Sequence, residues 1–386
     1  VGSIQKALII SSMAIGCMAS PLVGMFADRF WPAQKVLAML NMLHAFMLLW
    51  AGLTSNPDIL FVSLLIGMLA YMPSWSLTSA IAMAHLPSEE FPKVRVFGSI
   101  GWVASGIFSI IFIRFLNIDF DGTNIPFLCG AGISMATAFY NFSLPHTPPL
   151  AKGQKVTLID AFGLGTIQLM KDRTFSIFII LSFLSMIPFA MYYSFFSQFL
   201  LNINTKYISV TMNWGVLAEM GFLLLVPIAI RKYGIRKTMI LGLIALTIRY
   251  LAFYAGGVAS QPWVYYIGIL IHGLIFGFFY VGGQIYIDQK APGRLKSQAQ
   301  GFIFLITFGI GLLVGNFICA RLIETFRIAD GYNWNAIWGI TTIASLILLA
   351  GFWILFKDQA VLAENKTARP LVTEEPSTAE SKSLTL

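Results

Sequence analysis

The chain has 386 residues, of which 57% are hydrophobic and only 11% charged, so it has too little polar surface to cover a soluble globule of this size. Its net charge of +8 does not require a nucleic acid partner, because the basic residues lie in loops that can face anionic lipid. Three cysteines at unrelated spacings indicate neither a disulfide framework nor a metal site; they are Cys17, Cys129 and Cys319.

Eleven apolar stretches follow one another along the chain, each close to the length that a membrane-spanning helix needs. They lie near residues 7–26, 36–53, 59–83, 97–115, 125–142, 175–201, 208–230, 239–255, 263–287, 299–319 and 337–355. The sequence therefore predicts an all-α integral membrane protein embedded in a lipid bilayer.

The loops between these stretches alternate in basic charge. The odd-numbered loops hold fifteen Lys and Arg residues, namely Arg29, Lys35, Lys93, Arg95, Lys152, Lys155, Lys171, Arg173, Arg231, Lys232, Arg236, Lys237, Lys290, Arg294 and Lys296. The even-numbered loops and adjoining span ends hold four, namely Arg114, Lys206, Arg321 and Arg327. Because cytoplasmic loops retain Lys and Arg, we expect the odd loops and the C-terminus to be cytoplasmic and Val1 to lie outside.

The longest predicted cytoplasmic connection divides the chain into unequal halves. Residues 1–144 contain five spans and residues 174–357 contain six. The linker, 145–173, starts with a proline-rich stretch, and its residues 156–170 are amphipathic enough to lie on the membrane surface. The tail, 358–386, is rich in Glu, Lys, Ser and Thr and is expected to be disordered.

If the five-span and six-span halves were once equal, one helix is missing ahead of Val1.

Two loop motifs recur at one offset. The loop Gly24–Phe30 is echoed by Arg231–Lys237 about 200 residues later, and Phe91–Arg95 is echoed by Ala291–Lys296. Tight cytoplasmic turns collect Gly and basic residues in any case, so one echo alone is weak. Two echoes at the same offset favour a parallel duplication of a helical bundle.

These motifs resemble a known family. Gly24-x-x-x-Asp28-Arg29 followed by Lys35 is similar to the loop signature of the major facilitator superfamily. Longer sequence strings resemble the bacterial nucleoside:proton symporters, in particular a branch whose members are assigned as nucleoside transporters. These strings are Ala70–Pro73, Phe91–Trp102, Tyr233–Lys237, Tyr286–Pro292 and Ala299–Gly301.

The resemblance covers the chain from Val1 to about Lys357. It implies the major facilitator fold, with two pseudo-symmetric six-helix bundles, so that the eleven transmembrane helices present would be twelve minus the first. It also implies a monomer in the bacterial inner membrane that imports nucleosides with protons and needs no cofactor.

Glu219 is a carboxylate in the middle of a predicted span, flanked by Leu217, Ala218, Met220 and Gly221. An ionisable group at this depth is by default a functional candidate. Desolvation favours its neutral form, which can exchange a proton when the cavity opens to water. We therefore predict that Glu219 couples transport to protons; the alternative is a structural hydrogen bond to a neighbouring helix.

Candidate substrate residues lie on three other predicted spans. Arg95, Ser99 and Trp102 begin one span, where Arg95 could instead extend to the cytoplasmic surface. Aromatic faces with a few hydrogen-bonding groups suit a nucleoside. Such groups are Tyr192, Tyr193 and Gln198 on one span and His272, Phe276, Tyr280 and Gln284 at helical spacing on another. The resemblance favours Arg95, Ser99, Trp102, Tyr193, Glu219, His272 and Phe276, although such aromatic stripes more often pack in membrane bundles.

Asp28 and Arg29 would act as a cytoplasmic latch by resemblance. Two other charged or titratable groups lie within spans, and we expect His44 to contact a helix and Arg249 to reach toward the outer surface. The chain also departs from the family. The family carries an acid directly after the position of Phe276, where this chain has Gly277, and nucleoside-contacting amides correspond to Ala190, Tyr193 and Val216.

Two other functional classes are alternatives to this interpretation. A membrane enzyme would need a nucleophile with a base, or a metal constellation, and the sequence contains no such grouping near one membrane face. A porter of the same fold for sugars or drugs is the alternative, because architecture does not fix substrate.

Overall fold

A computed structural model describes residues 3–27, 29–85, 91–149, 162, 164–291, 296–329 and 331–357. The first half contains α1 (Ser3–Ala27), α2 (Ala33–Leu53), α3 (Pro57–His85), α4 (Phe91–Ala104), α5 (Gly106–Ile110), the π-helix η1 (Ile111–Phe115) and α6 (Ile125–Asn141). The second half begins with the short 3₁₀ helix η2 (Leu164–Lys171), the described part of the predicted linker segment. The predicted tail lies outside the described residues, as do residues 150–161 and 163 of the linker.

The remaining elements of the second half are α8 (Arg173–Asn202), α9 (Ile208–Leu223), α10 (Val226–Tyr233), α11 (Ile235–Val258), α12 (Trp263–Leu270), α13 (His272–Leu274), η3 (Ile275–Val281), α14 (Gly282–Lys290), α15 (Lys296–Phe304), η5 (Leu305–Gly311), α16 (Leu312–Thr325), β1 (Arg327–Ile328), β2 (Gly331–Tyr332) and α17 (Trp334–Leu355). The strands form one short antiparallel hairpin, with Arg327 opposite Tyr332.

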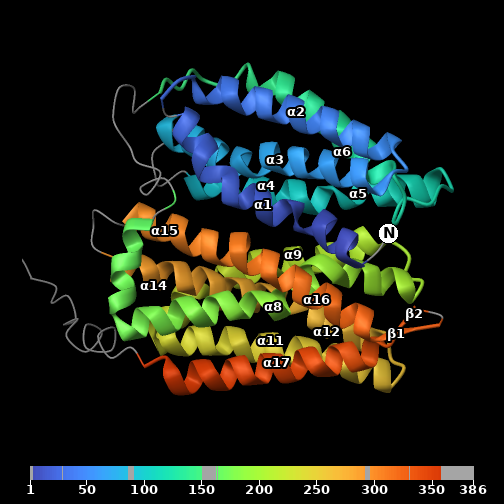
Figure 1. The fold of residues 1–386 in the computed structure, drawn as a ribbon, viewed down its shortest axis with the longest axis vertical. Helices are drawn as coiled ribbons and strands as arrows, with labels where there is room; N and C mark the ends of the chain where they lie inside the picture. Colours follow the sequence, from blue (N-terminus) through green and yellow to red (C-terminus); the bar gives the residue numbers. More distant parts are fainter. Residues whose placement is uncertain are drawn as a thin grey trace, which may run out of the picture.

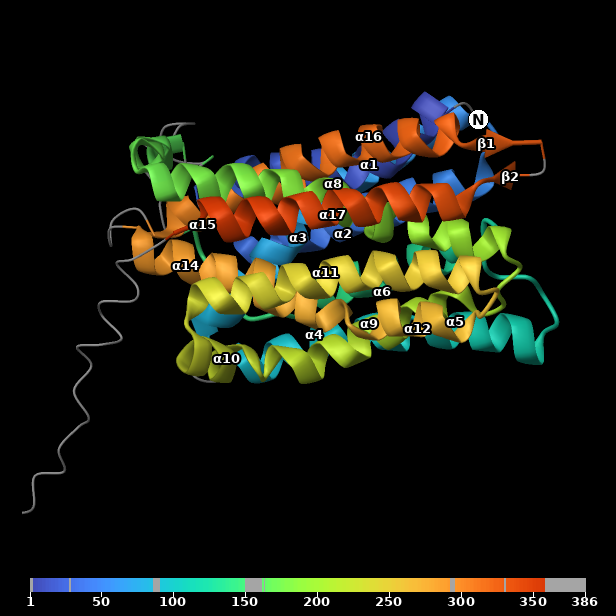
Figure 2. The same cartoon turned by 90° about the horizontal axis from the view of Figure 1, so that it is seen from below.

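The helices run side by side in two bundles (Figure 1). In the first, α1 and α2 pack on α3, and α2 packs on α6; in the second, α11 packs on α17 and α8 on α16. Figure 2 shows the long helices of both bundles along one common direction. The prediction of an all-α membrane protein built from two helical bundles is confirmed.

Within the described residues, nine helical segments are long and apolar enough to cross a membrane, and the bent pair α9 and α10 makes a tenth. The predicted segment near 125–142 corresponds to α6, whose 17 residues lie at the short limit for a span. The total number of spans stays a prediction.

The predicted span over 208–230 corresponds to α9 and α10 and is bent rather than straight. Its helix breaks between α9 and α10, which are bent by 50° relative to each other. Pro227 stands in the first turn of α10, and because proline lacks an N–H and its ring clashes with the carbonyl four residues earlier, α9 cannot continue through it. The break lies one turn beyond Glu219.

The predicted span over 263–287 is also interrupted. It is built from α12, α13, η3 and α14, with a π-helical stretch at Ile275–Val281. Wide turns of this kind recur at functional sites in membrane helices because they redirect side chains. Phe276 and Tyr280 both lie in this stretch.

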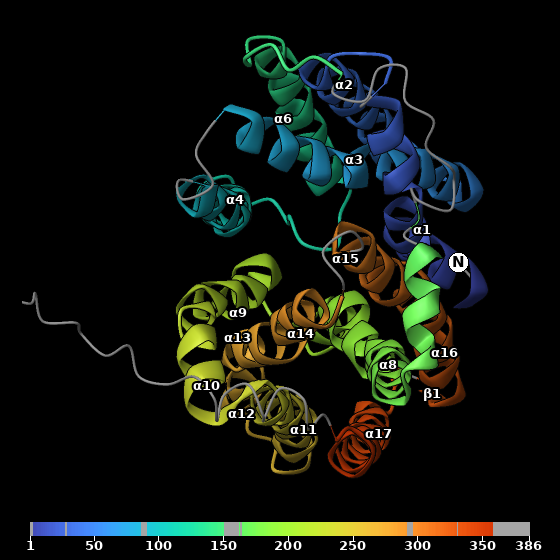
Figure 3. The same ribbon diagram turned by 90° about the vertical axis from the view of Figure 1, so that its left-hand side faces the viewer.

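The two bundles are joined through helix pairs that contact across them, chiefly α1 with α16 and α4 with α9. Figure 3 views the molecule along the helices and shows α1 beside α16. Among the described residues, the hydrogen bonds between the bundles come from Asp121, Asn213 and Asn316. Asn213 Nδ2 donates to the carbonyl of Val103 at 3.1 Å, and Asn316 Nδ2 donates to Ser11 Oγ at 3.3 Å.

Asp121 caps a helix of the other bundle. Tyr207, at the N-cap position of α9, has left-handed backbone angles (φ 59°) and supplies no side-chain cap. Asp121 Oδ2 instead accepts from the amide of Ile208 at 2.9 Å, and its Oδ1 accepts from Ser209 Oγ at 2.7 Å. Free amides at a helix start need such an acceptor, and a carboxylate also suits the helix dipole. The start of α9 is thus bound to the first bundle. We call this end of the molecule the Asp121 end, and the opposite one, which carries Arg29, Lys35 and Lys290, the basic end.

Candidate functional site

The candidate site lies where the backbones of α9 and α13 approach each other closely. A Cβ added at Gly273 would lie 2.4 Å from the Cα of Glu219, so only glycine permits this approach. One turn earlier on α9, a Cβ at Gly215 would lie 3.3 Å from the hydroxyl of Tyr192 and 3.0 Å from the Ile269 carbonyl. Small residues of this kind bring membrane helices close together. They hold Glu219 beside the start of α13.

The close approach places Glu219 next to His272. The distance between Glu219 Oε2 and His272 Nε2 is 3.5 Å, and 19% of the Glu219 side chain is exposed. His272 itself is buried. The structure therefore brings the predicted coupling acid and a predicted substrate residue together at the break in α9.

Arg249 is the residue on which the sequence prediction fails. We expected it to reach toward the outer surface, but its exposure is 0%. Its Nε donates to the carbonyl of Gly268 at 2.9 Å, and its Nη2 lies 2.8 Å from His272 Nδ1. The guanidinium carbon lies 3.9 Å from the centre of the Tyr192 ring, a cation–π contact. Close helix packing, together with partners on α8, α12 and α13, retains Arg249 inside the bundle.

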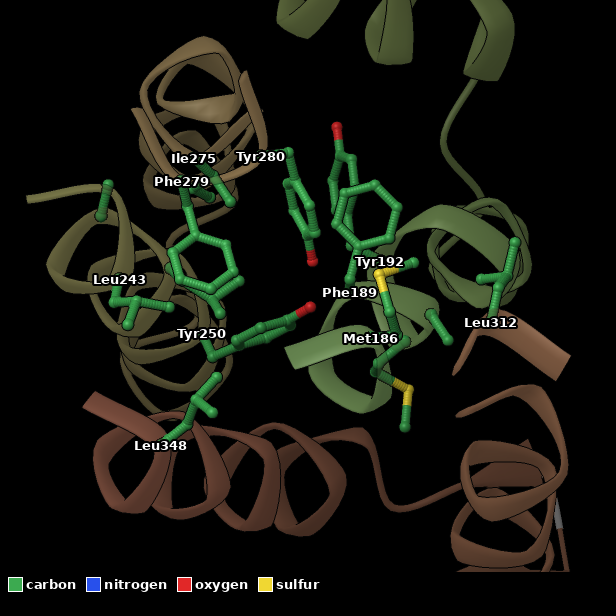
Figure 4. Packing of buried hydrophobic residues seen from close by; sticks show 14 of the residues in the cluster. Met186, Phe189, Tyr192, Leu243, Tyr250, Ile275, Phe279, Tyr280, Leu312 and Leu348 are labelled. Carbon is green, nitrogen blue, oxygen red and sulfur yellow. The ribbon is translucent and has the colours of Figure 1, made fainter. Parts of the chain in front are cut away.

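Aromatic rings continue the site along the second bundle. The ring of Phe276 lies 6.3 Å from that of His272 and 6.1 Å from that of Tyr280. Phe189 joins Tyr280 at 4.9 Å and stacks on Tyr193 at 5.3 Å. Figure 4 shows Tyr280 of η3 beside Phe189 of α8 in the large core of this bundle. Flat apolar faces with hydroxyl and imidazole groups at their edges can receive an aromatic base.

The first bundle contributes a second group of aromatic residues. Trp102 of α4 is 44% exposed and meets the edge of Trp75 at 6.5 Å between ring centres. Trp75 in turn contacts Tyr71, which stacks on His44 at 4.7 Å. Ser99 lies one turn before Trp102 and is half-buried.

His44 makes the helix contact that the sequence predicted. Its Nδ1 lies 3.1 Å from Ser134 Oγ, which joins α2 to α6.

Some predicted residues cannot be placed. The side chain of Arg95 and the whole of Asp28 lie outside the described residues, so their roles stay predictions, as does the latch with Arg29. The family departures can be placed. A Cβ at Gly277 would lie 3.1 Å from Val226, so this position packs against the break in α9, and Ala190 is fully buried beside Gly315.

Sequence reasoning missed Arg249 and the two glycines. A signal for Arg249 was present, because an arginine in the middle of an apolar span is as costly as a glutamate there and needs a partner. Glu219 was the carboxylate to pair it with. No comparable signal marks Gly215 or Gly273 among the 33 glycines of the chain, because their role depends on which helices meet.

The comparisons with known proteins decide the family. The sequence model of the nucleoside H+ symporters matches residues 2–361. The chain belongs to the nucleoside H+ symporter family. The resemblance of its loop strings to this family is therefore confirmed, and so is the interpretation that it is a transporter rather than an enzyme.

A sequence relative agrees with this assignment, and solved structures show the fold. The chain is 36% identical over 358 residues to the transporter YegT of Escherichia coli (strain K12), covering 89% of this chain and 84% of that protein. A crystal structure of the nucleoside transporter NupG has a TM-score of 0.81 at 23% identity, covering 93% of this chain and 91% of that one. The xylose transporter XylE of E. coli shares the fold more distantly, with a TM-score of 0.64 at 14% identity, covering 91% of this chain and 88% of that one. The predicted major facilitator fold is confirmed.

Proposed function

We propose that this protein imports nucleosides together with protons across the bacterial inner membrane by alternating access. Membership of the nucleoside H+ symporter family supports the substrates. The observation that carries the mechanism is the pairing of Glu219 with His272 at the break in α9, at 3.5 Å. Broken helices at mid-membrane are where transporters of this architecture place their substrate and ion sites.

Glu219 is the proton-coupling group in this proposal. In a water-filled cavity the carboxylate takes up a proton from the outer side, and after the halves rock it releases the proton inside. Proton binding and nucleoside binding each favour the switch through their different contacts in the two states. His272 stands within reach of the Glu219 carboxylate and the Phe276 ring, so one residue links the two ligands.

The nucleoside lies between the bundles in this proposal. Trp102 and Ser99 of α4 face it from one side, with Arg95 as a further contact. Tyr193, His272 and Phe276 face it from the other. Aromatic rings stack on the base, and imidazole and hydroxyl groups bind the ribose hydroxyls.

The contacts at the Asp121 end support an inward-facing state. Basic loops mark the cytoplasmic side of membrane proteins, so the basic end is assigned to the cytoplasm and the Asp121 end to the outside. The cap that Asp121 places on α9 then closes the outer side. The C-terminus lies on the cytoplasmic side in this assignment, and the protein acts as a monomer.

Transport by the full chain in proteoliposomes tests the proposal. An inward proton gradient should drive accumulation of labelled uridine or adenosine. Glu219→Gln should abolish accumulation but retain exchange of nucleoside across the membrane without a gradient, because exchange needs no net proton movement. Glu324→Gln is the matched control, since Glu324 is an acid in the last turn of α16 that pairs with Arg327 of β1. Gradient-driven uptake of xylose or of cationic drugs in place of nucleosides would overturn the proposal and favour the alternative porter.

A further inference from the structure

Arg249 is a buried charge that the proposed function leaves unused. It lies in the middle of α11 with an exposure of 0%. Removing an unpaired cation from water is costly enough that such groups are found paired with an acid or in a functional site. Its contacts with the Gly268 carbonyl, the Tyr192 ring and the Tyr250 side chain are with neutral groups. A further contact is with His272.

The contact with Arg249 determines which ring nitrogen of His272 carries the hydrogen. A guanidinium can only donate hydrogen bonds, so His272 Nδ1, at 2.8 Å from Arg249 Nη2, must accept. A histidine that accepts at Nδ1 is neutral and carries its proton on Nε2. This Nε2 atom lies 3.5 Å from Glu219 Oε2. Neutral His272 therefore stands between the two charged groups, accepting from the Arg249 guanidinium at Nδ1 and presenting Nε2–H to the Glu219 carboxylate.

We propose that Arg249 is the buried counter-ion of the proton-coupling carboxylate Glu219 and acts on it through neutral His272. The inference rests on the proposed role of Glu219. When Glu219 is ionised, the charges of the three residues sum to zero. When Glu219 takes up a proton, Arg249 is left as an uncompensated charge in a dry interior, which favours the conformation in which water reaches the site. Arg249 is a positioning residue in this scheme, because it touches neither proton nor nucleoside.

Among the described side chains, the other titratable groups that face Arg249 and Glu219 are chiefly tyrosines. Tyr192 and Tyr193 face Glu219 from α8, and Tyr250 on α11 and Tyr280 on η3 face Arg249. From α4, residues 97–104 bring no titratable side chain against α9. Tyrosines stay neutral at the pH values of interest, so the charge balance among the described side chains here depends on Arg249, His272 and Glu219.

A stability cycle on the purified full chain tests the charge pairing. Arg249→Met and Glu219→Gln, measured at pH 8, each remove one of the two opposite charges and should lower Tm by about 5 °C or more. The double variant removes both charges and should regain at least half of the summed loss. Arg236→Met is the matched control, because Arg236 donates to the carbonyls of Trp353 and Phe356 and should combine additively with Glu219→Gln. Additive losses for Arg249→Met and Glu219→Gln would overturn the inference.

The pH dependence of uptake provides a readout that a purely structural role would not move. Without the Arg249 charge, Glu219 keeps its proton to higher pH, so half-maximal proton-dependent uptake should move upward by about 1 pH unit. His272→Leu should produce the same shift with Arg249 intact. His272→Gln should keep the wild-type pH midpoint even if its nucleoside affinity changes, because its amide oxygen can accept from Arg249 while its nitrogen donates to Glu219. Wild-type pH dependence in His272→Leu would contradict the inference.

The two proposals fail in different ways. If wild-type protein accumulates no nucleoside, or Glu219→Gln accumulates as wild type does, the proposed function is wrong. If those results are as expected but Arg249→Met keeps the wild-type pH dependence and an additive stability effect, only the counter-ion role is wrong.

Discussion

Asp121 Oδ1 accepts a hydrogen bond from Ser209 Oγ at 2.7 Å, and this contact joins the loop of one bundle to the first turn of a helix in the other. The same carboxylate accepts from the amide of Ile208 at 2.9 Å and from Ser109 Oγ at 3.1 Å. It thus ties its own bundle and the start of α9 together with a single charged group. Because α9 carries Glu219, closure of this end and placement of the coupling acid involve the same helix.

We predict that Asp121→Ala shifts the molecule toward a state open at the Asp121 end. Hydrogen bonds to a charged group contribute about 1.5–3 kcal/mol each, so losing this cap should change the ratio of states tenfold or more. Spin labels at Ile118 and Lys206, both exposed, should report a longer distance in the variant. Asp119→Ala is the control, since Asp119 is an exposed acid two residues away. An unchanged distance distribution in Asp121→Ala would contradict the role of this cap.

Replacing Gly273 should damage the site by backbone displacement alone. In Gly273→Ala the new methyl group would lie 2.4 Å from the Cα of Glu219, so α9 must move away from α13. Overpacking of this kind costs about 1–3 kcal/mol, and we expect a lower Tm together with loss of proton-driven accumulation. Gly132→Ala on α6 is the control, because a Cβ there meets nothing within 4 Å. Full activity in Gly273→Ala would show that the close approach is dispensable.

Trp102 should contribute to nucleoside affinity by stacking. Its side chain is 44% exposed on α4, with one edge held by Trp75. Loss of an aromatic stacking surface for a base costs about 1–3 kcal/mol, so Trp102→Ala should raise KM about tenfold or more, while Trp102→Phe should raise it less. Trp263→Ala, at the start of α12, tests for general effects of losing an exposed tryptophan. Equal KM values for wild type and Trp102→Ala would remove this residue from the binding site.

Asp172 should make stability depend on acid pH at the basic end. Its burial raises the pKa, but hydrogen bonds from the amides of Phe175 and Thr174 and the ion pair with Lys290 outweigh this and hold the pKa of Asp172 below its usual value. A carboxyl group with a lowered pKa contributes stability above its unfolded pKa, and this contribution is lost as pH falls through the folded pKa.

A comparison of Tm between pH 6 and pH 3 checks this. In the wild type, part of the fall in Tm should come from Asp172, and in Asp172→Asn that part should be absent, because asparagine still caps α8 but does not titrate. Asp172→Ala should cost about 1 kcal/mol near neutral pH through the lost cap. Parallel pH curves for wild type and Asp172→Asn would show that the carboxylate is not stabilising.

Apolar length and loop charge were enough to predict the helical bundles, because lipid forces each span to satisfy its own backbone hydrogen bonds. The family strings predicted the fold and the transporter class. The bend between α9 and α10 has a signal in the sequence, because Pro227 stands within the apolar run and cannot continue a helix. The place of Arg249 within an apolar span indicated that it needs a buried partner, but its own span does not show which residue that partner is. Its partner, His272, lies 23 residues away on another helix.

The cap on α9 also bears on how the chain assembles in the membrane. Asp121 is synthesised well before Ile208, so its carboxylate is already in place when α9 inserts. Tyr207 provides no cap of its own, and the first amides of α9 therefore find their acceptor in a segment made earlier. The second bundle, expressed alone, would insert this helix with a frayed start, and co-expression of residues 1–149 should restore it.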